Sequence, residues 1–224
     1  MKEKLTIARL KQSAKEFCDI ESSFKNKDLY GVTDGKAVGT YIEHKFQSYL
    51  AERFDYEIGS SAKGIDLPSE EIMTDIKVTS TRQPQSSCPF KDAKQKIFGL
   101  GYNLLVFVYD KTDSEMEHVA VLNFVSCIFL DKDRTADYTT TFRLREMVQD
   151  GAIKEDIIAY LQDKNIPADE ITIDSIADQV LNQSFKQGYL TISNALQWRL
   201  QYARVRDLTE AVGGITKIID KVIK

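Results

Sequence analysis

Hydrophobic positions recur along the chain with two different periods, and these periods predict its helices and strands. Spacings of three and four residues predict helices over 4–22 and 37–54. Alternation with period two predicts a strand over 71–80. A nearly continuous apolar run over 102–109 is typical of a strand buried on both faces. Residues 119–130 are predicted to hold another strand, which could lead into a short helix. The first half of the chain is therefore predicted to form an α/β core.

The second half is predicted to be mainly helical. Between the two halves, a polar loop over 82–89 is followed by a lysine-rich helix over 90–98. Further helices are predicted over 139–149, 153–164, 169–182 and 190–208, with a short last helix after Gly213 and Gly214. The order indicates a core over 1–135 and a helical C-terminal subdomain over 136–224, packed as one compact unit.

Composition excludes several classes of protein. With 224 residues, 42% hydrophobic and 29% charged, the chain matches neither disordered nor collagen-like sequences. Its three cysteines are scattered and its histidines number two, which argues against a disulfide framework and a histidine-rich zinc site. No membrane span, signal peptide or GxxxxGK[ST] phosphate loop is found, so we expect a cytoplasmic protein with no membrane partner and no nucleotide cofactor.

The stretch over 63–80 carries the candidate chemistry. Asp66 lies at a turn, and Asp75 and Lys77 lie two residues apart on one face of the strand that follows. A hairpin would bring the two carboxylates together, and their repulsion favours a divalent cation between them. Oxygen ligands and retained water favour Mg²⁺, and the lysine could orient or deprotonate a water or offset charge on a phosphate. This arrangement favours metal-assisted hydrolysis of a phosphodiester.

The sequence Asp66…Asp75-Ile76-Lys77 resembles the PD-(D/E)xK nuclease motif, in the form found in type II restriction endonucleases. Ile65 stands where the motif has proline, and Glu43 occupies the place of the acidic residue that many of these enzymes carry on a preceding helix. The resemblance covers roughly residues 37–110. It implies a fold with a central mixed sheet flanked by helices.

The resemblance also implies a role for each residue of the motif. Asp66 and Asp75 would bind Mg²⁺ directly, and Ile76 would contribute its backbone carbonyl. Glu43 would hold a second metal or an outer-shell water, and Lys77 would position the attacking water. The implied activity is cleavage of double-stranded DNA at a short specific sequence, leaving 5′-phosphate and 3′-hydroxyl ends. A palindromic site would require a homodimer.

Arginine and glutamine, the side chains that bond bidentately to guanine and adenine, are found in the polar loop after the motif strand. Phosphate contacts are expected from the lysines that follow, Lys96 included, and groove or phosphate contacts from a polar stripe on the 190–208 helix. The candidate DNA-contacting residues are Lys63, Thr79, Arg82, Gln83, Gln85, Ser86, Ser87, Lys91, Lys94, Arg199 and Arg206.

The formal net charge of −4 argues at first against a polyanionic partner. The charges are unevenly distributed, however. Residues 77–96 carry five basic side chains and one acidic one, and residues 186–224 carry seven and three. Residues 131–180 carry six basic and twelve acidic side chains, so the acidity is concentrated in the middle helices. The overall charge is compatible with a DNA-binding surface formed by the two basic segments.

Simpler interpretations remain open at this stage. Asp75 and Lys77 could form an ion pair on an exposed strand, Glu43 could belong to a solvated helix face, and the 82–87 segment could be an ordinary surface loop. The helix over 190–208 could pack on the core or on a second subunit. Two other functions also remain: a nuclease of the same superfamily that reads DNA structure in repair or recombination, and a non-catalytic DNA-binding or protein-interaction module.

Overall fold

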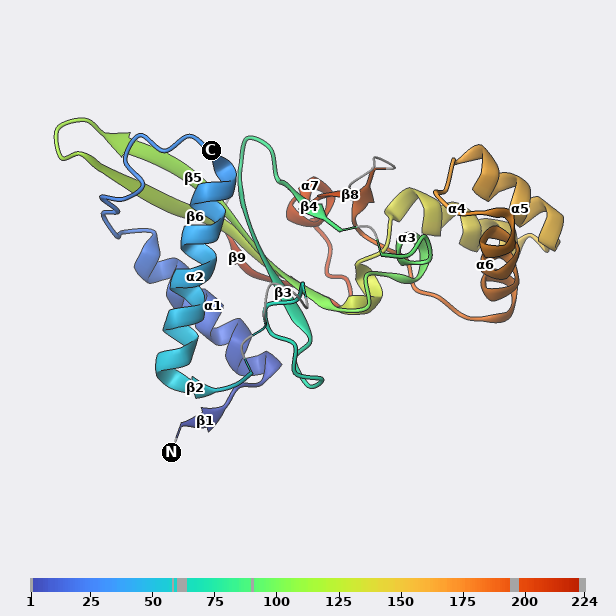
Figure 1. Cartoon of the computed structure of the whole chain (residues 1–224), viewed down its shortest axis with the longest axis horizontal. Helices are drawn as coiled ribbons and strands as arrows, with labels where there is room; N and C mark the ends of the chain where they lie inside the picture. Colours follow the sequence, from blue (N-terminus) through green and yellow to red (C-terminus); the bar gives the residue numbers. More distant parts are fainter. Residues whose placement is uncertain (1, 58, 60–63, 90, 194–197, 222–224) are drawn as a thin grey trace. The chain divides into compact units, whose positions relative to one another are not determined.

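The computed structural model describes residues 2–57, 59, 64–89, 91–193 and 198–221, and it shows mixed α/β architecture (Figure 1). The chain forms two compact units, each assembled from separate stretches of sequence. Unit 1 comprises Met1–Ser86, Asn103–Leu130 and Leu208–Lys224, and unit 2 comprises Ser87–Tyr102 and Asp131–Asp207.

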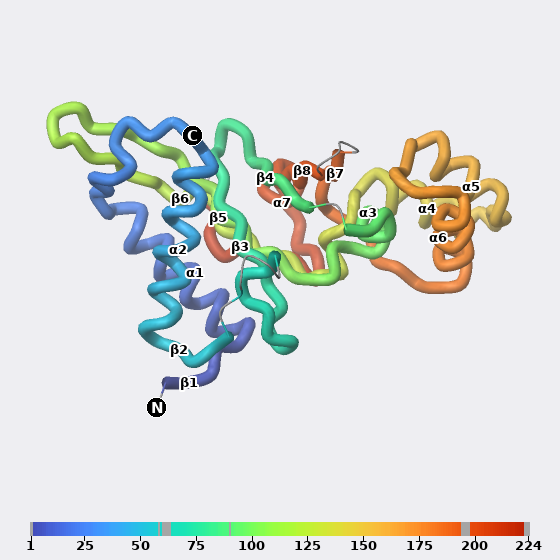
Figure 2. Tube along the Cα trace, in the orientation of Figure 1, coloured from blue at the N-terminus to red at the C-terminus, as the bar shows by residue number. Residues whose placement is uncertain are grey.

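This division differs from the linear one expected after residue 135. Residues 87–102 belong to unit 2, although they precede two strands of unit 1, and residues 208–224 return to unit 1 (Figure 2). Hydrophobic periodicity along the chain shows which face of an element is buried, but it does not show which other element buries it. Within the described residues, none of the helices has the length and apolar character needed to cross a membrane.

A four-stranded mixed sheet forms the centre of unit 1. Its strands are β3 (Thr74–Ser80), β5 (Asn103–Ser114), β6 (Val119–Leu130) and β9 (Ile215–Asp220), in the order β3-β5-β6-β9. β3 and β5 are parallel, whereas β5–β6 and β6–β9 are antiparallel. Leu104 to Tyr109 are at most 3% exposed, which confirms the prediction that this strand is covered on both faces.

The short last helix predicted after Gly214 is wrong, because Ile215–Asp220 forms strand β9. Its sequence, Ile-Thr-Lys-Ile-Ile-Asp, is rich in β-branched residues, which favour strands. Ile219 pairs with Cys127 of β6, so this segment from the end of the chain completes the sheet.

Two helices pack on the central sheet of unit 1. α1 (Ile7–Glu21) packs on β6, and α2 (Gly35–Arg53) packs on β3. Both begin at a capping side chain: the Thr6 hydroxyl accepts from the Arg9 N–H at 3.3 Å, and Asp34 accepts from the Lys36 N–H at 2.9 Å. A short parallel pair, β1 (Glu3–Lys4) with β2 (Phe54–Asp55), joins the start of α1 to the end of α2.

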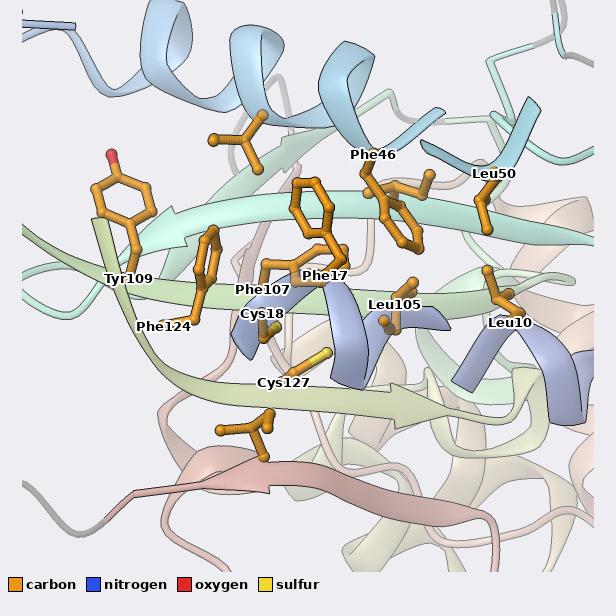
Figure 3. Packing of buried hydrophobic residues seen from close by; sticks show 14 of the residues in the cluster. Leu10, Phe17, Cys18, Phe46, Leu50, Leu105, Phe107, Tyr109, Phe124 and Cys127 are labelled. Atoms are coloured by element: carbon orange, nitrogen blue, oxygen red, sulfur yellow. The ribbon is translucent and has the colours of Figure 1, made fainter. Parts of the chain in front are cut away.

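Aromatic rings fill the space between these helices and the sheet (Figure 3). The rings of Phe17 and Phe46, one from each helix, lie 5.1 Å apart between centroids, and Phe46 lies 5.1 Å from Phe107 of β5. All three side chains are at most 3% exposed. The cluster fixes α2 against the sheet, and α2 is the helix that carries Glu43.

The cysteines agree with the prediction that there is no disulfide framework. Cys18, Cys88 and Cys127 are all free thiols and all buried. Cys18 on α1 and Cys127 on β6 both lie in the core of unit 1 (Figure 3). Burial raises the pKa of the Cys127 thiol well above its ordinary value, so it packs as a neutral, apolar group.

Helices form most of the regular secondary structure of unit 2. The helices predicted over 139–149, 153–164 and 169–182 are confirmed as α4 (Tyr138–Gln149), α5 (Lys154–Asp163) and α6 (Glu170–Asn182). They share an apolar core that includes Leu144, Ile157 and Ile176. The shorter segments are α3 (Gln95–Phe98), the 3₁₀ turn η1 (Lys132–Arg134) and α7 (Ala203–Arg206).

The predicted helix over 190–208 is wrong. The described part of this segment forms strands β7 (Thr191–Ile192) and β8 (Trp198–Gln201), followed by the short helix α7. Trp198 and Leu200 are buried while Arg199 and Gln201 are exposed, which is alternation with period two. Because Ile192 and Leu200 pair across the two strands, they share a buried face without belonging to a helical stripe.

Two further expectations about the middle of the chain are corrected. The loop predicted over 82–89 contains strand β4 (Gln85–Cys88), which joins β8 and β7 in a sheet of order β4-β8-β7. Residue 90 lies outside the described residues, and within 91–98 the predicted helix is helical only over Gln95–Phe98. Its start is delayed because the Asp92 side chain accepts the Lys94 N–H at 2.8 Å, which forms a turn before the helix.

Candidate active site

A hairpin in unit 1 places Asp66 beside the motif strand, as predicted. Leu67 and Thr74 form an antiparallel bridge, with each N–H donating to the other residue's carbonyl oxygen at 3.0 Å. The turn between them closes on the carbonyl oxygen of Ser69, which accepts from the N–H of Met73 at 2.7 Å. The eight residues between the two aspartates thereby form a hairpin, and Asp66 lies next to β3.

The Asp66 carboxylate is held at both oxygens. Oδ2 accepts the backbone N–H of Ile76 at 2.7 Å, and Oδ1 lies 3.4 Å from the donor Nε2 of Gln47 on α2. On the backbone side, the Asp66 carbonyl oxygen accepts from the N–H of Gly59 at 2.8 Å. A Cβ atom at Gly59 would lie 1.9 Å from the Ile65 carbonyl oxygen, so only glycine allows this close approach.

The hydrogen bond from Ile76 also indicates where its carbonyl oxygen lies. In a β-strand, the N–H and C=O of one residue project from the same edge. β3 is an edge strand of its sheet, and the Ile76 N–H points toward Asp66 and away from β5. The Ile76 carbonyl therefore projects to the same side as the Asp66 carboxylate, which is the position that the predicted metal-binding role requires.

Asp75 and Lys77 lie on the same face of β3 and form an ion pair. Lys77 Nζ lies 2.7 Å from Asp75 Oδ2, and Asp75 is 4% exposed. The alternative of an ion pair on a solvent-exposed strand is therefore wrong. Burial raises the pKa of Asp75 to about 7, with Lys77 acting in the opposite direction and Asp66 adding to the increase.

Glu43 faces the same cluster from α2. Gly39, one turn earlier, lies against β3, and a Cβ there would lie at a contact distance of 3.4 Å from the Val78 carbonyl oxygen. Burial, followed by the charge of Asp66 and a hydrogen bond with it, raises the pKa of Glu43 to about 8. Glu43 is half-buried and interacts with Asp66, which favours a place in the cluster over a fully solvated helix face. Burial alone would lower the pKa of Lys77, but Asp75 raises it overall.

The donor set fits a hard divalent cation. Glu43, Asp66 and Asp75 share one small volume. Burial first, and then the neighbouring carboxylates, raise the pKa values of Glu43 and Asp75, and a cation would relieve the repulsion between the carboxylates. Among the described residues, no three His, Cys, Asp or Glu side chains form a ready-made ligand cage. The remaining ligands would be a backbone oxygen and water, which is the coordination that Mg²⁺ commonly has in proteins.

The predicted DNA-contacting residues differ in their exposure to solvent. Arg82, Gln83, Ser87, Lys91 and Arg199 are exposed, and Gln85, Ser86, Lys94 and Arg206 are half-buried. Thr79 is 6% exposed, and its hydroxyl accepts from the N–H of Gln85 and donates to the carbonyl of Gln83, both at 3.1 Å. Thr79 thus holds the shape of the loop. Lys63 lies outside the described residues.

Two basic side chains proposed for phosphate or groove contact have protein partners instead. Lys96 is 6% exposed and donates to the Ile192 carbonyl oxygen at 2.9 Å, so its predicted phosphate contact is wrong. The Arg206 guanidinium bonds both carboxylate oxygens of Asp207, at 2.7 and 3.1 Å.

Gln47 and Gly59 are the site residues that sequence reasoning missed. Gln47 lies four residues after Glu43, so helical spacing would place both on one face of α2 and could have suggested it. Gly59 carries no such signal, because its contact with Asp66 depends on the tertiary path of the chain.

Comparison with known proteins agrees with this geometry. A family model described as type II restriction enzyme NspV matches residues 4–217. The chain is 51% identical to the type II restriction enzyme NspV of Nostoc sp. (strain ATCC 29411 / PCC 7524) over 214 residues, which is 96% of each sequence. No solved structure matches. The chain therefore belongs to the NspV family of type II restriction enzymes, which are site-specific deoxyribonucleases.

Proposed function

We propose that this restriction enzyme cleaves double-stranded DNA with Mg²⁺ at the Asp66–Asp75–Lys77 cluster, and that it leaves 5′-phosphate and 3′-hydroxyl ends. The observation that carries the proposal is the 2.7 Å hydrogen bond from Ile76 N–H to Asp66. It joins the two halves of the PD-(D/E)xK motif across the hairpin and directs the Ile76 carbonyl toward the carboxylates.

The residues of the cluster would have separate tasks. Asp66, Asp75 and the Ile76 carbonyl would hold the metal ion, and Glu43 would bind a second ion or an outer-shell water. When bound, Mg²⁺ supplies Lewis acidity at the scissile phosphate and polarises water. Lys77, released from its 2.7 Å pairing with Asp75 by competition from the cation, would orient the attacking water or stabilise charge on the phosphate.

DNA would be held by the exposed and half-buried polar residues outside this cluster. We assign sequence reading to Arg82, Gln83, Gln85, Ser86 and Ser87, in the segment that directly follows the catalytic strand. Lys63, Lys91 and Lys94 would contact phosphates, and Thr79 would hold the shape of the loop. A homodimer would match a palindromic recognition site. The cytoplasmic location stays a prediction.

Digestion of a mixed-sequence plasmid, followed by sequencing of the fragment ends, tests this proposal. With Mg²⁺ we expect discrete fragments that share one short end sequence, and no cleavage in EDTA. Asp75→Ala and Lys77→Ala should abolish the fragments. Lys111→Ala is the matched control. Like Lys77, Lys111 pairs with an aspartate two residues away on its own strand, in this case Asp113 on β5, but it is not part of the motif. A smear of products, or cleavage only of branched DNA, would indicate a structure-specific nuclease and contradict the proposal.

A further inference from the structure

The three-stranded sheet β4-β8-β7 has one apolar face and one polar face. On the apolar face, Trp198 and Leu200 are fully buried. On β8 the residues that alternate with them, Arg199 and Gln201, are exposed. Because the side chains of a strand alternate between its two faces, Arg199 and Gln201 share the polar face.

Two hydroxyl side chains extend this polar face onto the neighbouring strands. Thr191 of β7 is exposed and lies directly opposite Gln201 in the antiparallel register. Ser87 of β4 is exposed as well, whereas the next residue, Cys88, is buried. We call the set Ser87, Thr191, Arg199 and Gln201 the polar sheet face. All four residues belong to unit 2.

Arg199 differs from most arginines of the chain in its surroundings. Of the nine arginines in the sequence, seven have a protein partner for the guanidinium group, which is a carboxylate, a backbone carbonyl or an aromatic ring: Arg9, Arg53, Arg134, Arg143, Arg145, Arg204 and Arg206. Among the described residues, Arg199 and Arg82 have no such partner. The guanidinium of Arg199 is thus available, on a strand whose backbone is fixed by pairing.

The chemistry of the polar sheet face matches the edges of DNA bases. An arginine bonds bidentately to guanine and a glutamine to adenine, and hydroxyl groups bond to either. Strands β4, β7 and β8 contain no aspartate or glutamate, so no carboxylate on them opposes a polyanion. A paired β-ribbon also has the right size for the major groove.

We infer that the polar sheet face reads base edges in the recognition sequence, with Arg199 and Gln201 as its principal specificity residues. This inference rests on the proposed function, because it presupposes site-specific cleavage. It assigns Arg199 a base contact where the sequence suggested phosphate or groove contact, and it adds Thr191 and Gln201, which sequence analysis did not single out.

Binding measurements on matched DNA duplexes test the inference. The wild-type plasmid digest comes first and supplies the recognition sequence, so failure of the proposed function appears as an absence of discrete fragments. Fluorescence anisotropy with Ca²⁺ in place of Mg²⁺ then compares a duplex that carries this sequence with an unrelated duplex. For Arg199→Ala and Gln201→Ala, we expect affinity for the cognate duplex to fall by about 10- to 100-fold, with affinity for the unrelated duplex nearly unchanged.

Arg199→Lys separates base reading from phosphate contact. Lysine retains the charge but loses the bidentate geometry, so this variant should lose cognate affinity as Arg199→Ala does and keep its binding to unrelated DNA. Arg143→Ala is the control, because Arg143 is an exposed arginine of the same unit that pairs with Glu146. Equal losses on both duplexes, full rescue by lysine, or no loss in any variant would each overturn the inference.

Discussion

Replacing Glu43 by glutamine should change how the stability of the protein depends on pH. The side chain keeps its shape but can no longer ionise. In the folded protein the pKa of Glu43 is raised to about 8 from an ordinary 4.5, because burial and the neighbouring Asp66 disfavour its charged form. In the unfolded chain the pKa returns to its ordinary value. Between these two values the folded state binds the additional proton, so stability falls as pH rises.

The size of the effect follows from the shift in pKa. One pKa unit corresponds to about 1.36 kcal/mol, and a single group with these two values would reduce stability by about 2 kcal/mol between pH 6 and pH 8. Glu43 is partly exposed, and solvent screening reduces this to about 1 kcal/mol. Between pH 6 and pH 8, the free energy of unfolding should therefore fall by about 1 kcal/mol less in Glu43→Gln than in the wild type.

Urea unfolding in EDTA, followed by far-UV circular dichroism at pH 6 and pH 8, measures the difference. Trp198, the single tryptophan of the chain, lies in unit 2, so its fluorescence reports separately on that unit. Glu52→Gln is the control, because Glu52 lies on the same helix with its side chain 74% exposed. If Glu43→Gln loses as much stability as the wild type between the two pH values, Glu43 is not held in the crowded environment described above.

Three other changes probe the packing around the site. Gly59→Ala should destabilise the protein by about 1–3 kcal/mol and slow cleavage, since the added Cβ would displace the backbone beside Asp66; thermal unfolding at the wild-type midpoint would contradict this. Gln47→Ala should weaken Mg²⁺ binding on the order of 10-fold in calorimetric titration, and unchanged affinity would show that its contact with Asp66 is incidental. Phe107→Ala should cost about 3–5 kcal/mol in urea unfolding, because its ring is fully buried in the aromatic cluster, and a loss below 1 kcal/mol would mean that the core collapses around the gap.

Much of the candidate active site could be predicted from the sequence because its signals are local. The hairpin between Asp66 and Asp75, the alternation along β3 and the helix that carries Glu43 each depend on short-range periodicity or turn residues. The apolar strands β5 and β6 are likewise long enough for composition to identify them.

The errors arose where elements are short or where contacts are distant in sequence. In residues 190–208, apolar residues at 192, 196 and 200 fit a helical stripe, yet 192 and 200 face the same side of two paired strands. The environment of Lys96 could not be inferred either, because its partner, the Ile192 carbonyl, is 96 residues away. Gly59 shows the same limitation, since its role follows from where the chain passes Asp66.

A single-turnover cleavage experiment tests the central claim most directly. A short duplex carrying the recognition sequence is mixed with excess enzyme in Ca²⁺, and Mg²⁺ is then added to start the reaction. The account predicts that Lys77→Ala binds the duplex as the wild type does but does not cleave it, whereas Lys111→Ala both binds and cleaves. Cleavage by Lys77→Ala at the wild-type rate would contradict the assignment of the active site to this cluster.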